Sequence, residues 1–235
     1  MDQIVEKRTT QNEIFSIVFL GDFSPLNFTP KWFFDQKCIA QEDYDQTCSP
    51  ENKNTFLTPG LVTFETSFFS IEVTQQRFSV LLKKNPYTLL SDFVNIAFQN
   101  LTGIKIRALG INYQCVYAIA NASLYQQIGD RLAPKSYWAK LLGDEVSGDY
   151  RKSGLNNISM RKLKNGDDKG AINITLSPSP LVKQFGIVIS NNDHCDFGED
   201  VTMGDVLAFL KDKFETSILD SIALQADLLK GLLDE

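Results

Sequence analysis

The chain has 235 residues, of which 43% are hydrophobic and 22% are charged, as is typical of a globular protein with a buried core. The net charge of −6 argues against a protein that binds nucleic-acid phosphates over its whole surface. No apolar run approaches the length of about 18 residues that would suggest a membrane span. Residues 1–13 lack the apolar core of a signal peptide, so we expect a cytoplasmic protein.

The first half, residues 1–103, is predicted to be an α+β unit. It begins with a strand over residues 13–23, which are rich in β-branched and aromatic side chains. Both faces of this strand are apolar, so it should lie near the centre of a sheet. Thr29 can cap a short helix that has Pro30 at its first position. Residues 38–58 are polar and predict a long loop.

Three strands and a helix complete this half. Residues 61–84 predict the strands, because Phe69, Ile71 and Val73 alternate with polar residues and the same alternation follows the turn near TQQR. Residues 86–101 predict an amphipathic helix, because apolar residues recur at intervals of three and four.

The second half, residues 104–235, repeats this order of elements. A strand over residues 104–119 comes first, followed by helical pieces over 123–142 that are broken at Pro134. A long helix from about Thr202 toward Leu233 ends the chain. Between them three strands are predicted in GLNNISMRKL, GAINITL and LVKQFGIVIS, with a hairpin turn at KNGDD, residues 164–168.

The repeated order of strand, short helix, three strands and helix predicts the fold class. We expect an α+β protein in which two pseudo-repeated units share one large, mostly antiparallel sheet with helices mainly on one face. The two halves would then form one compact domain. Many α+β domains also give such strings of elements by chance, and no residue identity links the two units.

NNDHCDFGED, residues 191–200, holds the single histidine of the chain and resembles a site. A zinc site needs three or four ligands, and no second imidazole exists. His194 and Cys195 are adjacent, so on an extended segment their side chains would point apart. The acidic residues are expected instead in a loop at the positive end of the last helix, with Thr202 and Asp205 as a capping box. We therefore predict no metal ligands, no cofactor and no catalytic residues.

The four cysteines contain no C-x-x-C pair, which favours reduced thiols. Cys38 and Cys48 could meet across one loop, so a disulfide between them stays open.

A basic stretch over residues 151–169 is a candidate nucleic-acid or acidic-protein site. The other interpretation is a solvated sheet edge, where lysines prevent pairing with other strands. No aromatic residues are interleaved, which disfavours binding of single strands. The residues of the candidate site are Arg151, Lys152, Arg161, Lys162 and Lys164.

The last helix carries an apolar stripe about 30 residues long, or roughly 45 Å. Since one half of the sheet cannot cover that length, either the helix spans both halves or its end, LLKGLL, projects. A projecting end would be a surface for a protein partner or for self-association. Its residues would be Leu228, Leu229, Leu232 and Leu233.

Several segments resemble a sporadically distributed family of uncharacterised bacterial proteins of about this size. They are QQRFSVLL, PYTLLSDFVNIAF, ALGINY and the acidic DHCDFGED that leads into GDVLAFLKDKFETSI. The resemblance spans residues 60–220, and Ile111 and Asn112 stand where that family often has an arginine. The family brings no functional residues. Its patchy distribution implies accessory genes, including phage-defence loci.

Together these features predict a non-enzymatic protein-interaction subunit of a bacterial accessory or phage-defence complex. One alternative is a nucleic-acid-binding protein that uses the basic hairpin. Another is a small-molecule binder, in which some of the 17 phenylalanines line a cavity rather than fill a core.

Overall fold

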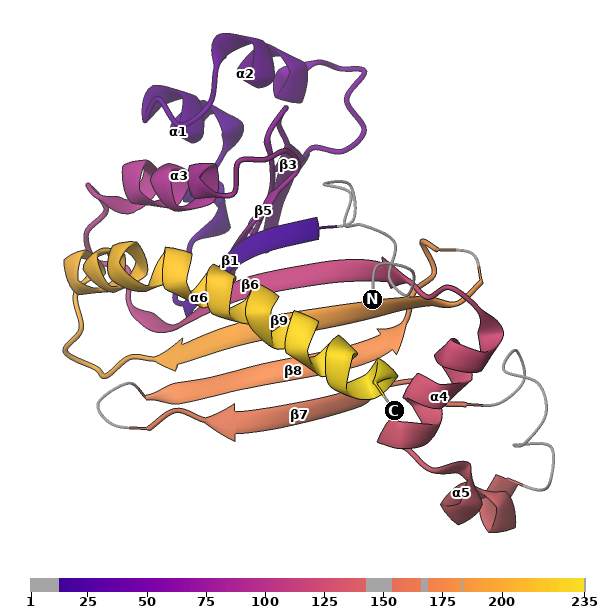
Figure 1. The fold of residues 1–235 in the computed structure, drawn as a ribbon. Coiled ribbons are helices and arrows are strands. Elements are labelled where there is room, and N and C mark those ends of the chain that lie inside the picture. Colours follow the sequence, from indigo (N-terminus) through magenta and orange to yellow (C-terminus); the bar gives the residue numbers. More distant parts are fainter. Residues whose placement is uncertain (1–12, 143–153, 166–168, 183, 235) are drawn as a thin grey trace.

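The computed structural model describes residues 13–142, 154–165, 169–182 and 184–234. Nine strands form one continuous antiparallel sheet in the order β2-β3-β4-β5-β1-β6-β9-β8-β7 (Figure 1). The predicted α+β class is confirmed. In the first half the elements are β1 (Glu13–Gly21), η2 (Pro25–Asn27), α1 (Pro30–Asp35), α2 (Gln41–Cys48), β2 (Phe56–Leu57), β3 (Leu61–Glu65), β4 (Phe69–Thr74), β5 (Arg77–Leu82) and α3 (Thr88–Phe98).

The second half follows the same plan. Its elements are β6 (Ile106–Ala118), α4 (Ala122–Leu132), α5 (Lys135–Leu142), β7 (Ile158–Leu163), β8 (Gly170–Pro178), β9 (Gly186–Asp196) and α6 (Met203–Leu233). The strand order is β3-β4-β5-β1 in one half and β7-β8-β9-β6 in the other. The two first strands, β1 and β6, pair antiparallel with Ile17 opposite Ile111. The pseudo-repeat therefore holds for the strand order as well as for the order along the chain.

The long loop predicted over residues 38–58 is wrong, because α2 and β2 lie within it. No side chain caps the start of α2, so the sequence lacks an N-cap signal there. Tertiary contacts hold the helix instead. Asp43, which is buried, accepts a hydrogen bond from the backbone N–H of Ser67 at 2.7 Å, and Tyr44 stacks on Phe34.

The acidic loop predicted for residues 193–200 is only partly right. Strand β9 runs through Asp193, His194 and Cys195 to Asp196, because the long strand β6 pairs with it as far as Ala108. Only the residues after Asp196 form the connection to α6. The capping box is confirmed, since the Thr202 and Asp205 side chains each accept a hydrogen bond from the other residue's backbone N–H.

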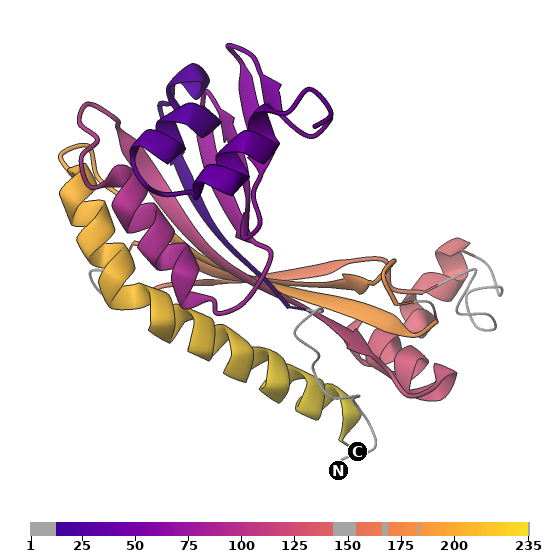
Figure 2. The same ribbon diagram turned by 90° about the horizontal axis from the view of Figure 1, so that it is seen from above.

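The helices α3 and α6 lie side by side on one face of the sheet, and no described helix covers the opposite face, which we call the open face (Figure 2). α6 crosses β6 and β9, and its C-terminal end packs against α4. Leu229, Leu232 and Leu233 are buried in the core, and Leu228 is half-buried. The end of α6 therefore does not project, and packing within the chain is what the structure shows.

Phenylalanines fill the core of the first half. The rings of Phe28, Phe33, Phe78 and Phe98 are fully buried and contact one another, with ring centroids between 4.8 and 6.4 Å apart. These four phenylalanines therefore belong to the core and do not line a cavity. In the described part of the chain no helix has the length and apolarity needed to cross a membrane.

Candidate functional site

The two halves differ in what covers the outer strands on the helix-bearing face. In the first half α1 lies there, and the buried Phe33 contacts Phe64 with ring centroids 5.6 Å apart. In the second half α4 and α5 lie beyond the strand ends (Figure 1). Several side chains of β7 and β8 are consequently uncovered: Met160 is 63% exposed, and Ile174 is half-buried. We call this strip, between α6 and the strands β7 and β8, the α6–β8 groove.

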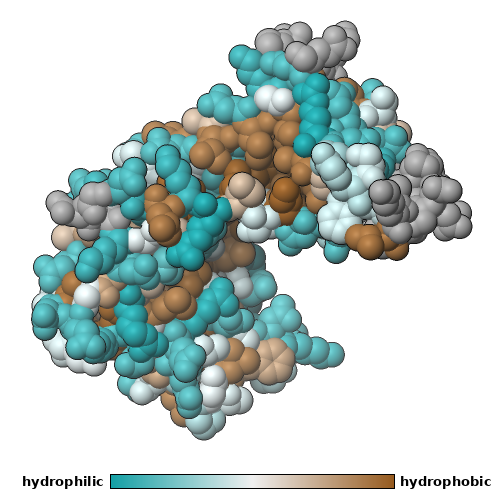
Figure 3. Space-filling view, turned by 90° about the horizontal axis from the view of Figure 1, so that it is seen from below, coloured by the Kyte–Doolittle hydropathy of each residue, from teal (hydrophilic) through white to brown (hydrophobic). Residues whose placement is uncertain are grey.

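Hydrophobic side chains gather over this part of the molecule in the view from below (Figure 3). Alternation along the strands places Met160, Ile172 and Ile174 on the face that bears α6. Helical spacing places Leu224, which is 40% exposed, on the facing wall. A contiguous patch of exposed apolar side chains is uncommon on a monomeric protein and is typical of a binding site.

One end of the groove deepens into a pocket of about 340 Å³. Its strand wall includes Lys162, Lys164, Ile172 and Asp193, and its helix wall includes Phe209, Lys213, Ser217 and Asp220. This volume lies at the lower end of the range for small-molecule sites, about 300–1,000 Å³.

Lys164 and Asp193 form an ion pair at this pocket, and both side chains are more than four-fifths buried. The Lys164 Nζ also donates a hydrogen bond to the Cys195 Sγ, 2.8 Å away. Burial alone would lower the pKa of the Lys164 ammonium, but the hydrogen bonds to Asp193 and Cys195 outweigh it and raise that pKa. Lys164 is therefore a fixed positive charge at neutral pH.

Gly170 allows Lys164 to reach two strands across the sheet. Gly170 lies between Lys164 and Cys195 in one cross-strand row. Its carbonyl accepts a hydrogen bond from the Lys164 backbone N–H at 3.1 Å, and it pairs with Cys195 on the other side. Its φ of +134° favours glycine, and an added Cβ would collide with the His194 carbonyl. The aliphatic part of the Lys164 side chain can therefore pass over Gly170, which has no side chain, to reach β9.

A group of buried polar side chains, which we call the buried seam, lies between α6 and the sheet beside the pocket and is centred on Gln225. Gln225 is fully buried, accepts a hydrogen bond from the Tyr117 hydroxyl at 2.9 Å and donates to the Ile189 carbonyl and to Asn191. Ser217 lies two turns earlier on the same face and is 6% exposed. Its hydroxyl has no hydrogen-bond partner among the described residues, although it belongs to the pocket wall. Such a group is costly to bury, so a bound molecule that hydrogen-bonds to it would be favoured.

His194 lies on the opposite, open face of the sheet. Its Nε2 is 2.9 Å from the Asp196 Oδ1. Neighbouring amides form a ladder there, in which Asn173 donates to Asn192 and Asn192 donates to Asn112. The faces of β9 therefore separate His194 from Cys195, as adjacency predicts. Within the described residues no group of three metal-ligating side chains occurs.

Of the predicted basic residues that the structure describes, Lys162 and Lys164 lie together at the pocket, and Arg161 does not join them there. Arg151 and Lys152 lie outside the described residues. Arg161 and Lys162 are exposed on opposite faces of β7, and Lys164 is paired with Asp193. Among the cysteines, Cys38 and Cys48 are free thiols, and burial raises the pKa of Cys38 to about 11.

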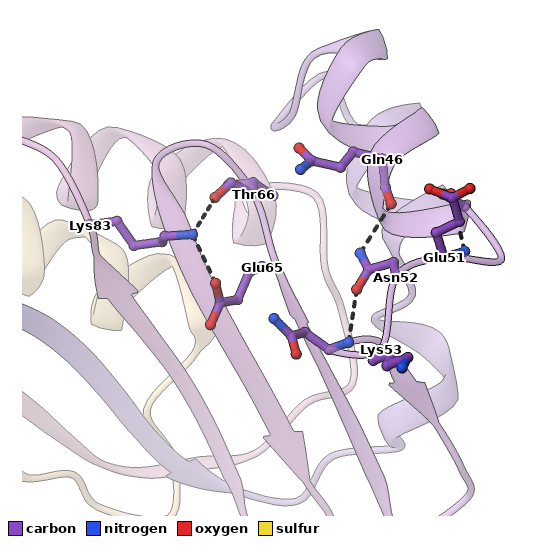
Figure 4. A pocket seen from close by; sticks show the side chains of 9 residues that line it. Gln46, Glu51, Asn52, Lys53, Glu65, Thr66 and Lys83 are labelled. Carbon is purple, nitrogen blue, oxygen red and sulfur yellow. Dashed lines mark hydrogen bonds and ion pairs between the residues drawn. The ribbon is translucent and has the colours of Figure 1, made fainter.

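A second pocket, of about 470 Å³, lies between the segment after α2 and the ends of β3 and β5 (Figure 4). Its walls are polar and bond largely to one another. Lys83 donates to Glu65 at 2.8 Å and to the Thr66 carbonyl at 3.0 Å, and Asn52 donates to the Gln46 carbonyl at 3.0 Å. The lining has two lysines and two glutamates, so it favours no ligand by charge.

The sequence reasoning missed the α6–β8 groove and its serine. One signal was present: Ser217, Ser221 and Gln225 interrupt the apolar stripe of the last helix at intervals of four. Polar residues on a buried helix face indicate a buried polar network or a ligand.

Comparison with known proteins adds little. No family model matches the chain, and no curated protein matches it. One solved structure is similar over 74% of this chain and 74% of its own, with 10% identical residues and a TM-score of 0.26. It is described as the crystal structure of the di-domain ARO/CYC StfQ from the steffimycin biosynthetic pathway. A similarity at this level carries no argument about function.

Proposed function

We propose that this chain is a non-enzymatic binding protein that holds a small molecule with an apolar body in the α6–β8 groove. The observation that carries the proposal is the contrast between the halves. Ile71 on β4 is fully buried under the helices of the first half, whereas Ile172 and Ile174 on the equivalent strand β8 are half-buried. A ligand in the groove would cover Ile172 and Ile174 as the helices of the first half cover Ile71.

The pocket at the end of the groove supports a small ligand rather than a protein surface. It is concave, its walls come from the sheet and from a rigid helix, and its volume suits one small molecule. Apolar side chains line the adjoining strip, and a few polar groups lie at one end. An apolar strip with a few polar groups at one end is typical of sites that bind amphipathic small molecules.

Titration with 1-octanol and 1-hexanol tests the proposal by isothermal calorimetry. Because each buried CH₂ contributes about 0.8 kcal/mol, octanol should bind on the order of tenfold more tightly than hexanol. Ile174→Trp should abolish binding, since the larger ring occupies the strip. Thr175→Trp is the matched control, because Thr175 is the next residue of β8 and points to the open face.

Both variants must first show the circular dichroism spectrum of the wild-type protein. Equal octanol affinity in the wild type and in Ile174→Trp would refute the assignment of the groove, as would no binding of either alcohol.

A protein-interaction subunit of an accessory or phage-defence complex remains a second candidate, now through α5. Tyr137 is 77% exposed, Trp138 is 47% exposed and Leu141 is 76% exposed, all on one helix. Exposed aromatic side chains are enriched at protein interfaces. Sedimentation velocity and purification from the native host test this candidate. A monomer that purifies alone, and that behaves identically after Trp138→Ser, would argue against it.

A further inference from the structure

The polar end of the α6–β8 groove has hydrogen-bond donors for which the described residues supply no acceptor. An ammonium has three N–H donors, and among the described residues the Lys164 Nζ has Asp193 and Cys195 as its partners. The Ser217 hydroxyl, 6% exposed on the facing wall, has no partner among the described residues. Both groups line the same pocket, so one bound atom group could accept from both.

The charges around these donors favour a negative group. The pocket is lined by Lys162, Lys164 and Lys213 against Asp193 and Asp220, which leaves one net positive charge in a chain whose net charge is −6. Asp193 is already neutralised by Lys164. Lys162 and Lys213 come from opposite walls.

Two exposed carboxylates lie near these lysines: Asp220, which is already included in the count, and Asp212, which is not part of the pocket wall. Asp212 pairs with Lys213 at 3.2 Å, but it is 71% exposed, so the pair is weak. Asp220 is exposed on the helix wall. Both are close to water, which screens them more than it screens the buried Lys164.

From this arrangement we propose that the ligand of the groove is an amphiphilic anion, with a carboxylate or phosphate held between Lys164 and Ser217. Its apolar body lies along Ile172, Ile174 and Met160. This inference rests on the proposed function, because the same groove holds the ligand. The net positive charge of the pocket would repel a cation and would add nothing to the binding of a neutral head group.

Four probes with one chain and different head groups test the proposal by calorimetry at pH 7.5: octanoate, octyl phosphate, 1-octanol and octylammonium. Charge-assisted hydrogen bonds predict that octanoate or octyl phosphate binds about tenfold more tightly than octanol, and octylammonium more weakly than octanol. The preference should shrink as NaCl is raised, whereas octanol affinity should not fall. The two anions distinguish a carboxylate ligand from a phosphate ligand.

Ser217→Ala and Lys213→Gln should each bring the affinity for the better anion close to the affinity that the same variant has for octanol. Lys211→Gln is the matched control, because Lys211 lies on the same helix, is exposed and is not part of the pocket wall. Octanol that binds as tightly as both anions would overturn the anionic ligand and leave the proposed function standing. A preference for octylammonium would do the same. If no probe binds, the proposed function fails and this inference fails with it.

Discussion

Ser217→Ala should make the protein more stable and a poorer binder. The Ser217 hydroxyl is buried and has no partner among the described residues, and burying such a group costs about 1–3 kcal/mol. Alanine removes that cost, keeps the Cβ and has a higher helix propensity than serine. Part of the gain is lost because a small void remains where the oxygen was.

The expected increase in the free energy of unfolding is about 1–2 kcal/mol without ligand. For a chain of this size, each kcal/mol raises the melting temperature by about 2–4 °C, so the expected increase is roughly 2–8 °C. Urea denaturation followed by circular dichroism, together with a thermal melt, measures both quantities.

Ser221→Ala is the matched control for this prediction. Ser221 lies one turn later on the same helix face, has the same exposed fraction of 6% and is not among the buried hydroxyls without a partner. Its replacement should gain helix propensity alone. If Ser217→Ala is no more stable than Ser221→Ala, the Ser217 hydroxyl already has a partner in solution, and the reasoning about the pocket is refuted.

Three further predictions concern the surroundings of the pocket. Gln225→Leu removes the three hydrogen bonds to Tyr117, Ile189 and Asn191 and should cost about 2–4 kcal/mol in urea denaturation; a cost below 1 kcal/mol would contradict the buried seam. Gly170→Ala should cost at least 2 kcal/mol, because its Cβ would collide with the His194 carbonyl, whereas Gly198→Ala, which has open space around it, should be close to neutral. Lys164→Met should cost about 3–5 kcal/mol at pH 7, because it leaves the buried Asp193 without its ion-pair partner. Since the pKa of Lys164 is raised above its ordinary 10.5, its stabilisation is complete below that pH and is lost as pH rises further, so the wild type and Lys164→Met should converge in stability above pH 10.5.

Much of the fold could be predicted because local patterns and tertiary structure agree. Thr29 and Pro30 start α1 as expected, and the alternation of Phe69, Ile71 and Val73 marks β4. α2 was missed, because its stability comes from the bond between Asp43 and Ser67 and from ring stacking, neither of which is local in sequence. The end of β9 was missed for a similar reason. Its polar residues predict a loop, but pairing with β6 extends the strand.

The candidate site was beyond sequence reasoning because it depends on which surfaces remain uncovered. The basic residues of the hairpin were visible, but alternation along β7 separates Arg161 from Lys162, and Gly170 lets Lys164 turn toward β9. The apolar stripe of the last helix was visible as well. Its terminal leucines could not be assigned to the core until the position of α4 was known. The groove itself follows from the different placement of the helices in the two halves.

The central claim is that the second half leaves a ligand groove where the first half fills its own. Nuclear magnetic resonance of isotope-labelled isoleucine methyl groups, during titration with 1-octanol and octanoate, tests it most directly. We expect the methyl signals of Ile172 and Ile174 to shift with saturation, while that of Ile71, buried on the equivalent strand β4, stays in place. Equal shifts at all three positions, or no shift at Ile172 and Ile174, would contradict the claim.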